Sequence, residues 1–179
     1  MPNSLTLLSP DGLTENMPQK SARLVPRIEP LYCRFPLRAG KSKIHRWGVY
    51  ADADIPANRK VIEYTGEKIG PREAERRHKT LYLFVLDDHW TIDGAVGGSG
   101  AELINHSCKP NLVTRMIRGH ILYMSLRPIR KGEELTVDYN FDDTDETVRC
   151  CCGARKCRGT INIQSRMNRA GGTGKPPHS

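Results

Sequence analysis

Apolar and polar residues alternate in short runs through the middle of the chain, and turn-forming residues separate these runs. Runs of this length that contain β-branched and aromatic residues predict strands. We expect six strands, at 47–51, 60–64, 82–86, 90–93, 120–126 and 134–139. Asp87 and Asp88 separate the third strand from the fourth as a hairpin turn would.

One segment predicts a helix. Pro71 suits a first helical turn, and charged residues dominate 72–77, so we expect this helix at the surface. The strands do not alternate with helices, which argues against a βαβ nucleotide-binding fold. The glycine-rich run 94–100 lacks the lysine of a phosphate-binding loop and predicts a turn in which backbones approach closely. The fold class is therefore mostly β, with few short helices.

The two ends of the chain differ in character from its middle. Residues 1–28 show no sustained period and predict a poorly ordered leader, and residues 164–179 predict a flexible basic tail. No apolar run approaches the roughly 20 residues of a membrane helix, and the start lacks the order of a secretory signal. We expect a soluble, intracellular protein without membrane contact.

The positive charge is concentrated near the C-terminus. Residues 31–148 hold 18 basic and 17 acidic side chains, whereas 149–169 hold six basic side chains and no acidic one. Such a segment either steers an anionic partner, including nucleic acid or a nucleosome, or is simply a solvated tail.

Four of the six cysteines fall within eight residues. Three of them form the spacing Cys150-x-Cys152-x4-Cys157, and a tetrahedral zinc site needs a fourth ligand, for which Cys108 is the candidate. In an intracellular chain this pattern favours zinc over free thiols or a disulfide. The remaining two cysteines, Cys33 and Cys151, are predicted to be structural.

Five motifs occur in an order that resembles the SET-domain protein lysine methyltransferases. They are Arg46-Trp47-Gly48-Val49, the segments 61–67 (VIEYTGE), 101–111 (AELINHSCKPN) and 132–139 (GEELTVDY), and the cysteine motif, which resembles a post-SET zinc motif. The likeness covers roughly residues 30–163. It implies a SET domain of several small sheets at 29–148 and a zinc-binding post-SET loop at 149–163.

The resemblance also implies an S-adenosyl-L-methionine cofactor and a site. Members of the family would place Trp47, Gly48, Tyr64, Asn105 and His106 against the cofactor; the alternative for Trp47 is a core anchor. The resemblance implies that Tyr139 and Tyr82 are catalytic, that Tyr82, Phe84 and Val137 line the substrate channel, and that zinc is bound by Cys108, Cys150, Cys152 and Cys157.

Three positions depart from the family pattern. Many members carry glycine where Arg46 stands, and many carry a basic residue where Glu102 stands. Val137 replaces the Phe or Tyr that usually lies two residues before the catalytic tyrosine. Because valine leaves room and offers no hydroxyl, we expect di- or trimethylation of the substrate lysine.

The resemblance implies a histone tail or another Lys-rich protein as substrate. The sequence shows no Cys-rich region before the SET domain and no reader domain, which favours a compact, bacterial-type member. The protein would be cytoplasmic in a bacterium and nuclear or chromatin-associated in a eukaryote. Two rival functions are a SET-like binding module without turnover and a zinc-stabilised nucleic-acid-binding domain. The first predicts loss of the catalytic tyrosine, but Tyr139 is present. The second predicts aromatic residues among the basic ones, but 149–169 contains none.

Overall fold

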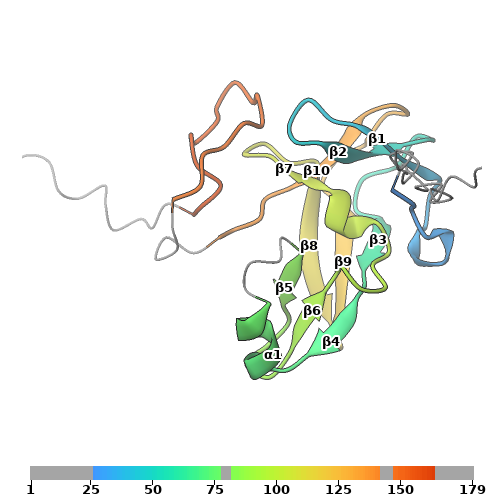
Figure 1. Ribbon diagram of the computed structural model, residues 1–179. Helices are drawn as coiled ribbons and strands as arrows, with labels where there is room; N and C mark the ends of the chain where they lie inside the picture. Colours follow the sequence, from blue (N-terminus) through green and yellow to red (C-terminus); the bar gives the residue numbers. More distant parts are fainter. Residues whose placement is uncertain (1–25, 78–81, 142–146, 164–179) are drawn as a thin grey trace, which may run out of the picture.

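The computed structural model describes residues 26–77, 82–141 and 147–163 and shows three small sheets (Figure 1). One sheet has the order β1-β2-β10-β7, formed by Leu37–Lys41, Trp47–Ala51, Glu134–Val137 and Asn105–His106. A second has the order β3-β9-β8, formed by Lys60–Tyr64, His120–Ser125 and Leu112–Ile117. The third has the order β4-β6-β5, formed by Glu67–Ile69, Thr91–Asp93 and Leu83–Val85.

Helical structure is short in the described residues. It consists of the α-helix α1 (Pro71–Arg76) and two 3-10 turns, η1 (Pro30–Tyr32) and η2 (Ala101–Leu103). The predicted surface position of α1 is confirmed, since none of its residues is buried. The mostly β fold class is therefore confirmed, and no described helix has the length and apolarity needed to cross a membrane.

All six predicted strands are present, and two of them, β2 and β3, have the predicted bounds. The predicted strand 134–139 is too long, because β10 ends at Val137, so Tyr139 lies beyond the strand. The turn at Asp87 is confirmed: its carboxylate accepts the backbone N–H groups of His89 and Trp90, each at 2.9 Å, and the flanking strands β5 and β6 pair antiparallel.

The core lies between the first two sheets. The fully buried core residues on the strands β2, β3, β8, β9 and β10 are Val49, Ala51, Val61, Ile62, Leu112, Ile121 and Leu135. Outside these strands, Ile55, Ala101, Ile104 and Ile129 are buried in the same core. Packing on both sides explains why β3 contributes two successive buried residues instead of a strict alternation. The N-terminal part of the described chain joins this core through Ile28. Residues 1–25 of the predicted leader and the predicted tail 164–179 lie outside the described residues.

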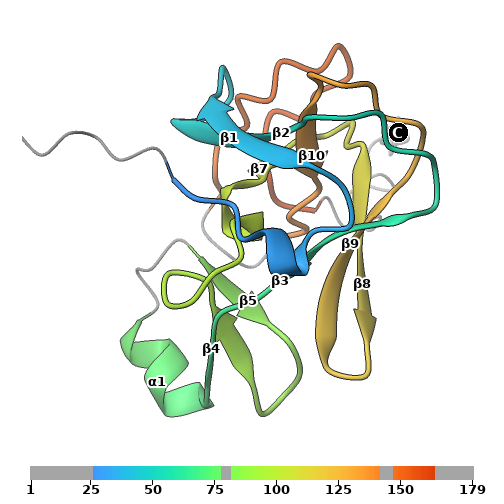
Figure 2. The same cartoon turned by 90° about the vertical axis from the view of Figure 1, so that its right-hand side faces the viewer.

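The segment 147–163 lies beyond the edge strand β7 of the first sheet (Figures 1 and 2). It contains isolated bridges rather than strands, including Phe141 with Asn162 and Arg149 with Thr160. Only Cys150 and Asn162 are buried within it. This segment therefore needs something other than apolar burial to hold its shape.

Candidate active site and metal centre

The Asn105–His106 pair forms the short strand β7, which runs parallel to β10. Thr136 lies opposite Asn105, and Val137 lies opposite His106. Both residues of the pair are buried, as is Val137 at 2% exposure. Because neighbouring side chains on a strand point to opposite faces, the two members of the pair reach different parts of the molecule.

Asn105 contacts the connection between β1 and β2. Its Nδ2 donates to the Trp47 carbonyl oxygen at 2.8 Å and to Glu134 Oε1 at 2.9 Å. The same Glu134 oxygen accepts the Ser42 hydroxyl at 2.7 Å. Glu134 lies within the motif 132–139, but the sequence did not predict that its carboxylate accepts hydrogen bonds here. Its partners, Ser42 and Asn105, lie far from it in the chain.

Gly48 lies in β2, beside the Glu134 side chain of β10. A Cβ at that position would lie 2.3 Å from Glu134 Oε1, so only glycine fits without displacing the carboxylate. Trp47 is half-buried and carries Lys41 Nζ over its ring, 4.0 Å from the ring centre. Trp47 is therefore not a core anchor, and its contact with the cofactor stays a prediction.

His106 joins the predicted catalytic tyrosine to the cysteines. Its Nδ1 accepts the backbone N–H of Tyr139 at 3.2 Å, and its Nε2 lies 3.4 Å from Cys108 Sγ. Burial lowers the pKa of His106, although Asp138 opposes this effect, so the ring is neutral at pH 7. An accepting Nδ1 places the proton on Nε2, which then donates to the Cys108 sulfur.

Tyr139 is held just past β10, with its side chain across β7. Its hydroxyl donates to the Ile104 carbonyl oxygen at 3.0 Å. Its ring meets the edge of His106, with the ring centres 5.4 Å apart, and stacks on Phe141 at 5.6 Å. Burial of the hydroxyl, together with nearby Tyr82, raises the pKa of Tyr139 to about 12, so the phenol stays protonated at neutral pH. The residue as a whole is 37% exposed.

Beside Tyr139 lies an aromatic group that spans the second and third sheets. Tyr64 packs against Phe84, with ring centres 5.4 Å apart, and its hydroxyl donates to the Tyr82 carbonyl oxygen at 2.6 Å. Tyr64 therefore contacts the predicted channel residues, while its contact with the cofactor stays a prediction. The group also contains Tyr123, whose ring centre lies 6.2 Å from that of Tyr64. The sequence analysis did not predict a role for Tyr123.

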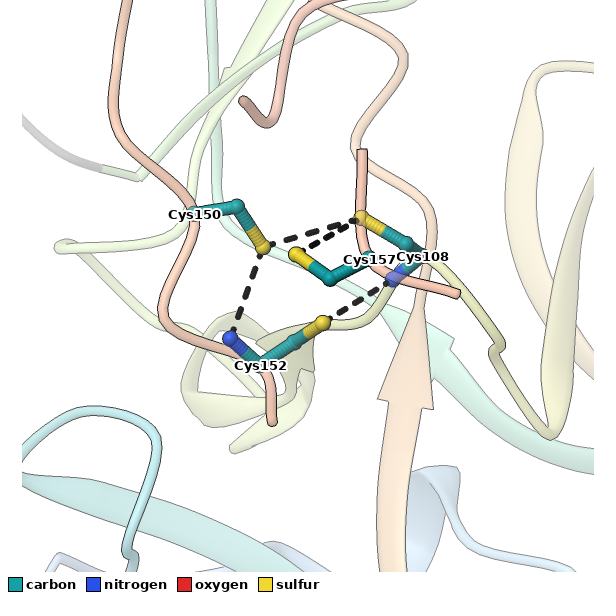
Figure 3. A group of neighbouring side chains, drawn as sticks. All are labelled: Cys108, Cys150, Cys152 and Cys157. Carbon is teal, nitrogen blue, oxygen red and sulfur yellow. Dashed lines mark hydrogen bonds between the residues drawn. The ribbon is translucent and has the colours of Figure 1, made fainter. Parts of the chain in front are cut away.

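The four predicted metal ligands lie together (Figure 3). The sulfur atoms of Cys108, Cys150, Cys152 and Cys157 all lie within 4.8 Å of one another. Cys108 Sγ is 3.6 Å from Cys150 Sγ and 3.8 Å from Cys157 Sγ. Four sulfurs at zinc–sulfur distances of about 2.3 Å in a tetrahedron would be about 3.8 Å apart, so the residues fit zinc.

Each of the four sulfurs also accepts a backbone N–H group. The donors to Cys108, Cys150, Cys152 and Cys157 are, in that order, Arg158 at 3.4 Å, Cys152 at 3.4 Å, Cys108 at 3.5 Å and Gly159 at 3.3 Å. Such bonds favour thiolates, the form that binds a metal. Against the opposing effect of burial, they lower the pKa of Cys152 to about 6, whereas burial raises the pKa of Cys108 and Cys150.

The two other cysteines take no part in this group. Cys33 donates to the Glu29 carbonyl oxygen at 3.5 Å, and burial raises its pKa to about 11. Cys151 is exposed and does not belong to the cluster of four sulfurs.

An ion pair also ties the cysteine segment to β10. Arg158 donates to both carboxylate oxygens of Asp138, at 2.5 Å and 3.0 Å. Asp138 lies between Val137 and Tyr139, so the pair joins the metal-binding loop to the backbone that positions the phenol. Of the basic residues predicted to form one charged face, Arg158 therefore points inward, while Arg149, Arg155 and Lys156 are exposed.

The comparisons with known proteins agree with this arrangement. The profile described as "SET domain" matches residues 46–140, just over half of the chain. The chain belongs to the SET-domain family. Cys108 lies within the matched residues and the other three cysteines of the cluster follow them, which is consistent with the post-SET zinc motif that the sequence resembles.

Similar proteins occur in fungi, plants and insects. A protein of Emericella nidulans named "Histone-lysine N-methyltransferase, H3 lysine-4 specific" is 39% identical over 142 residues, covering 71% of this chain and 12% of the fungal protein. "Histone-lysine N-methyltransferase ATX2" of Arabidopsis thaliana is 41% identical over 139 residues, 70% of this chain and 13% of the plant protein. "Histone-lysine N-methyltransferase trithorax" of Drosophila virilis is 38% identical over 133 residues, 68% of this chain and 4% of the insect protein.

The match therefore spans only a small part of each of these relatives. All three come from eukaryotes, so none of them supports the expectation of a bacterial-type member.

Proposed function

We propose that this SET domain transfers methyl groups from S-adenosyl-L-methionine to a lysine side chain of a histone or histone-like protein. The observation that carries the proposal is the position of Tyr139, whose hydroxyl and ring are fixed by Ile104, His106 and Phe141 beside the Asn105–His106 strand. The retained phenol and Asn-His pair argue against a binding module without turnover. Membership of the family and the names of the relatives support the same reaction.

The residues around Asn105 suit a cofactor with a charged amino-acid end. Trp47, Gly48, Tyr64, Asn105 and His106 would hold S-adenosyl-L-methionine, which supplies an electrophilic methyl group bound to a sulfonium. The Nδ2 group of Asn105 is occupied by protein acceptors, which leaves the Oδ1 oxygen to accept a ligand N–H. Lack of a Cβ at Gly48 lets the Glu134 carboxylate lie beside it, where it accepts from Asn105.

Tyr139 is a positioning and hydrogen-bonding group and not a base. With a pKa raised to about 12 it keeps its proton, which it donates to the Ile104 carbonyl oxygen. The lone pairs of its oxygen remain free to accept an N–H of the substrate amine. A lysine amine has a reference pKa near 10.4, and an aromatic channel that excludes water lowers this value, which favours the neutral, nucleophilic amine.

Val137 bears on the number of methyl groups. It is buried at 2% exposure, directly opposite His106 in the parallel pair. A valine occupies less volume than Phe or Tyr and holds no water by a hydroxyl. We therefore propose that the enzyme adds more than one methyl group to the same lysine.

The exposed basic residues of the metal-binding segment would face a chromatin substrate. Arg149, Arg155 and Lys156 are free of the inward ion pair that Arg158 forms, so they suit contact with nucleosomal DNA or an acidic protein surface. The proposed place of action is accordingly the nucleus.

The test uses labelled S-adenosyl-L-methionine with recombinant histones and, separately, with total lysate protein. Wild-type protein should label a histone lysine, and Tyr139→Phe should lose about 100-fold in rate, since a positioning hydrogen bond in a closed site is worth this order of magnitude. Tyr32→Phe is the matched control, because Tyr32 lies in η1, outside the residues that match the family. Equal labelling by wild type and Tyr139→Phe would remove Tyr139 from its role.

A further inference from the structure

Tyr123 is a buried phenol that the proposed reaction has not yet used. It lies in β9 between Ile62 of β3 and Thr114 of β8, and it is 3% exposed. Buried tyrosine hydroxyls usually find a hydrogen-bond partner. Among the described residues, the hydroxyls of Tyr64 and Tyr139 have one, but the hydroxyl of Tyr123 has none.

The Tyr123 hydroxyl is nevertheless open to a ligand. Within the described chain, the only buried side-chain nitrogen or oxygen that is sealed from solvent and lacks a partner is Arg158 Nε. The Tyr123 hydroxyl oxygen also has no hydrogen-bond partner, but it is not sealed from solvent in this way. Its oxygen therefore touches accessible space. An almost wholly buried ring with an accessible, unpaired oxygen is the geometry of a group that lines a pocket.

The neighbours of Tyr123 include the residues predicted to line the lysine channel. The ring of Tyr123 meets Tyr64 edge to face at 6.2 Å, and Tyr64 in turn packs on Phe84 and binds the Tyr82 carbonyl oxygen. Tyr82 and Phe84 are the predicted walls of the lysine channel. Burial, with smaller effects of Tyr139 and Glu102, raises the pKa of Tyr123, so its phenol stays protonated.

We propose that the Tyr123 hydroxyl lines the inner end of the lysine channel and limits the number of methyl groups to two. This inference rests on the proposed lysine methylation. Family members limit methylation with a residue two positions before the catalytic tyrosine, and here that position is Val137. Tyr123 comes from a different strand and supplies an oxygen to the volume that Val137 leaves.

The physical reason is that a group hydrogen-bonded to the Tyr123 oxygen and a third methyl group compete for the same volume. Each transfer forms an N–C bond at the amine, breaks the carbon–sulfur bond with its electron pair left on sulfur, and releases the amine proton to solvent. The Tyr123 oxygen accepts the one N–H of the protonated dimethyl-lysine, or a water hydrogen, within the volume that a third methyl needs, and the protonated nitrogen has no lone pair for a third transfer. Removal of the oxygen frees that volume and removes the hydrogen bond.

The test is the product distribution of Tyr123→Phe, measured by mass spectrometry on a peptide that wild type methylates. Wild type should accumulate dimethyl-lysine, and the variant should raise the ratio of trimethyl to dimethyl product about tenfold, which corresponds to the loss of one hydrogen bond. Tyr32→Phe is the matched control and should give the wild-type ratio. Tyr123→Leu also removes the oxygen and should shift the ratio in the same direction if the first variant is poorly folded.

A second readout needs no turnover. Wild type should bind a trimethyl-lysine peptide about tenfold more weakly than the dimethyl-lysine peptide, and Tyr123→Phe should bind the two alike. Unchanged product ratios at matched extents of reaction, in both Tyr123 variants, would overturn the inference while leaving the methyltransferase intact. Absence of transfer by wild type on every substrate would instead overturn the proposed function, and this inference with it.

Discussion

Two segments flank the Asn105–His106 strand, and they are held by different forces. On one side, the β1–β2 connection is fixed by hydrogen bonds to Asn105 and to Glu134. On the other side, the segment 147–163 is fixed by four sulfurs and by its ion pair with Asp138. One dipeptide thus serves both sides, since strand geometry sends its two side chains in opposite directions.

The difference shows how much each side depends on the folded body. The β1–β2 connection closes two paired strands whose register is already set by ten facing residues, from Leu37 with Ala51 to Lys41 with Trp47. The metal-binding segment buries only Cys150 and Asn162 among its described residues and forms no strand. We therefore expect the first side to loosen when its hydrogen bonds are removed and the second to unfold when its metal is removed.

The largest effect should follow loss of the metal. Wild-type protein should contain about one zinc per chain, and a chelator or Cys152→Ser should release it and unfold the segment 147–163. A structural zinc site supplies about 10 kcal/mol to folding, far more than the few buried side chains of this segment. Metal analysis and amide hydrogen exchange check the result.

Cys151→Ser is the matched control, because Cys151 is the neighbouring exposed cysteine and lies outside the sulfur cluster. It should keep both the zinc and the protection of the segment. The amide groups of β3 and β9 should stay protected in both variants, since their core is independent of the sulfurs. Global unfolding on chelation would contradict the separation of the two regions.

A smaller effect should follow loss of the carboxylate on the other side. Glu134→Ala leaves the Asn105 amide and the Ser42 hydroxyl without their shared acceptor, which should cost about 2 kcal/mol in the free energy of unfolding. Urea unfolding measures this loss. Hydrogen exchange should speed up at Ile44, whose amide N–H depends on the Ser42 hydroxyl.

Glu133→Ala removes an adjacent carboxylate that contacts Arg127 and the Arg130 amide instead. It should leave exchange at Ile44 unchanged, and neither variant should lose zinc. If Glu134→Ala released the metal, the two sides of the Asn105–His106 strand would be one cooperative unit.

The two sides of the Asn105–His106 strand also differ in how well their structure can be predicted from the sequence. The sulfur site is read from spacing alone, since three of its ligands are close in sequence and the coordination number demands a fourth. Strands such as β2 and β3 are predicted because their residues are apolar and β-branched, and burial on both faces keeps that signal strong. The strands β1, β4, β7 and β8 were missed.

Their residues explain the omission. Leu37–Lys41 contains two basic residues and a glycine, and Asn105–His106 is a polar pair, so neither carries a strand pattern. Their pairing is imposed by partners distant in sequence, as tertiary context overrides propensity. Glu134 and Tyr123 were missed as site residues for the same reason: the contacts that give them a role join strands that the chain brings together only on folding.

The smallest effect concerns Arg46, at the end of the β1–β2 connection. Arg46 has a φ of +39°, in the left-handed region that costs a non-glycine residue about 1 kcal/mol, and many family members have glycine there. Arg46→Gly should relieve this strain, and the gain is partly offset by the greater freedom of glycine in the unfolded chain. We expect a net stabilisation of about 0.5 kcal/mol, measured by urea unfolding. Asn58→Gly is the control, since Asn58 has a φ of +59° but asparagine tolerates that region, so its change should be nearer zero. Destabilisation by Arg46→Gly would mean that the arginine side chain stabilises this side of the site by more than its backbone strain costs.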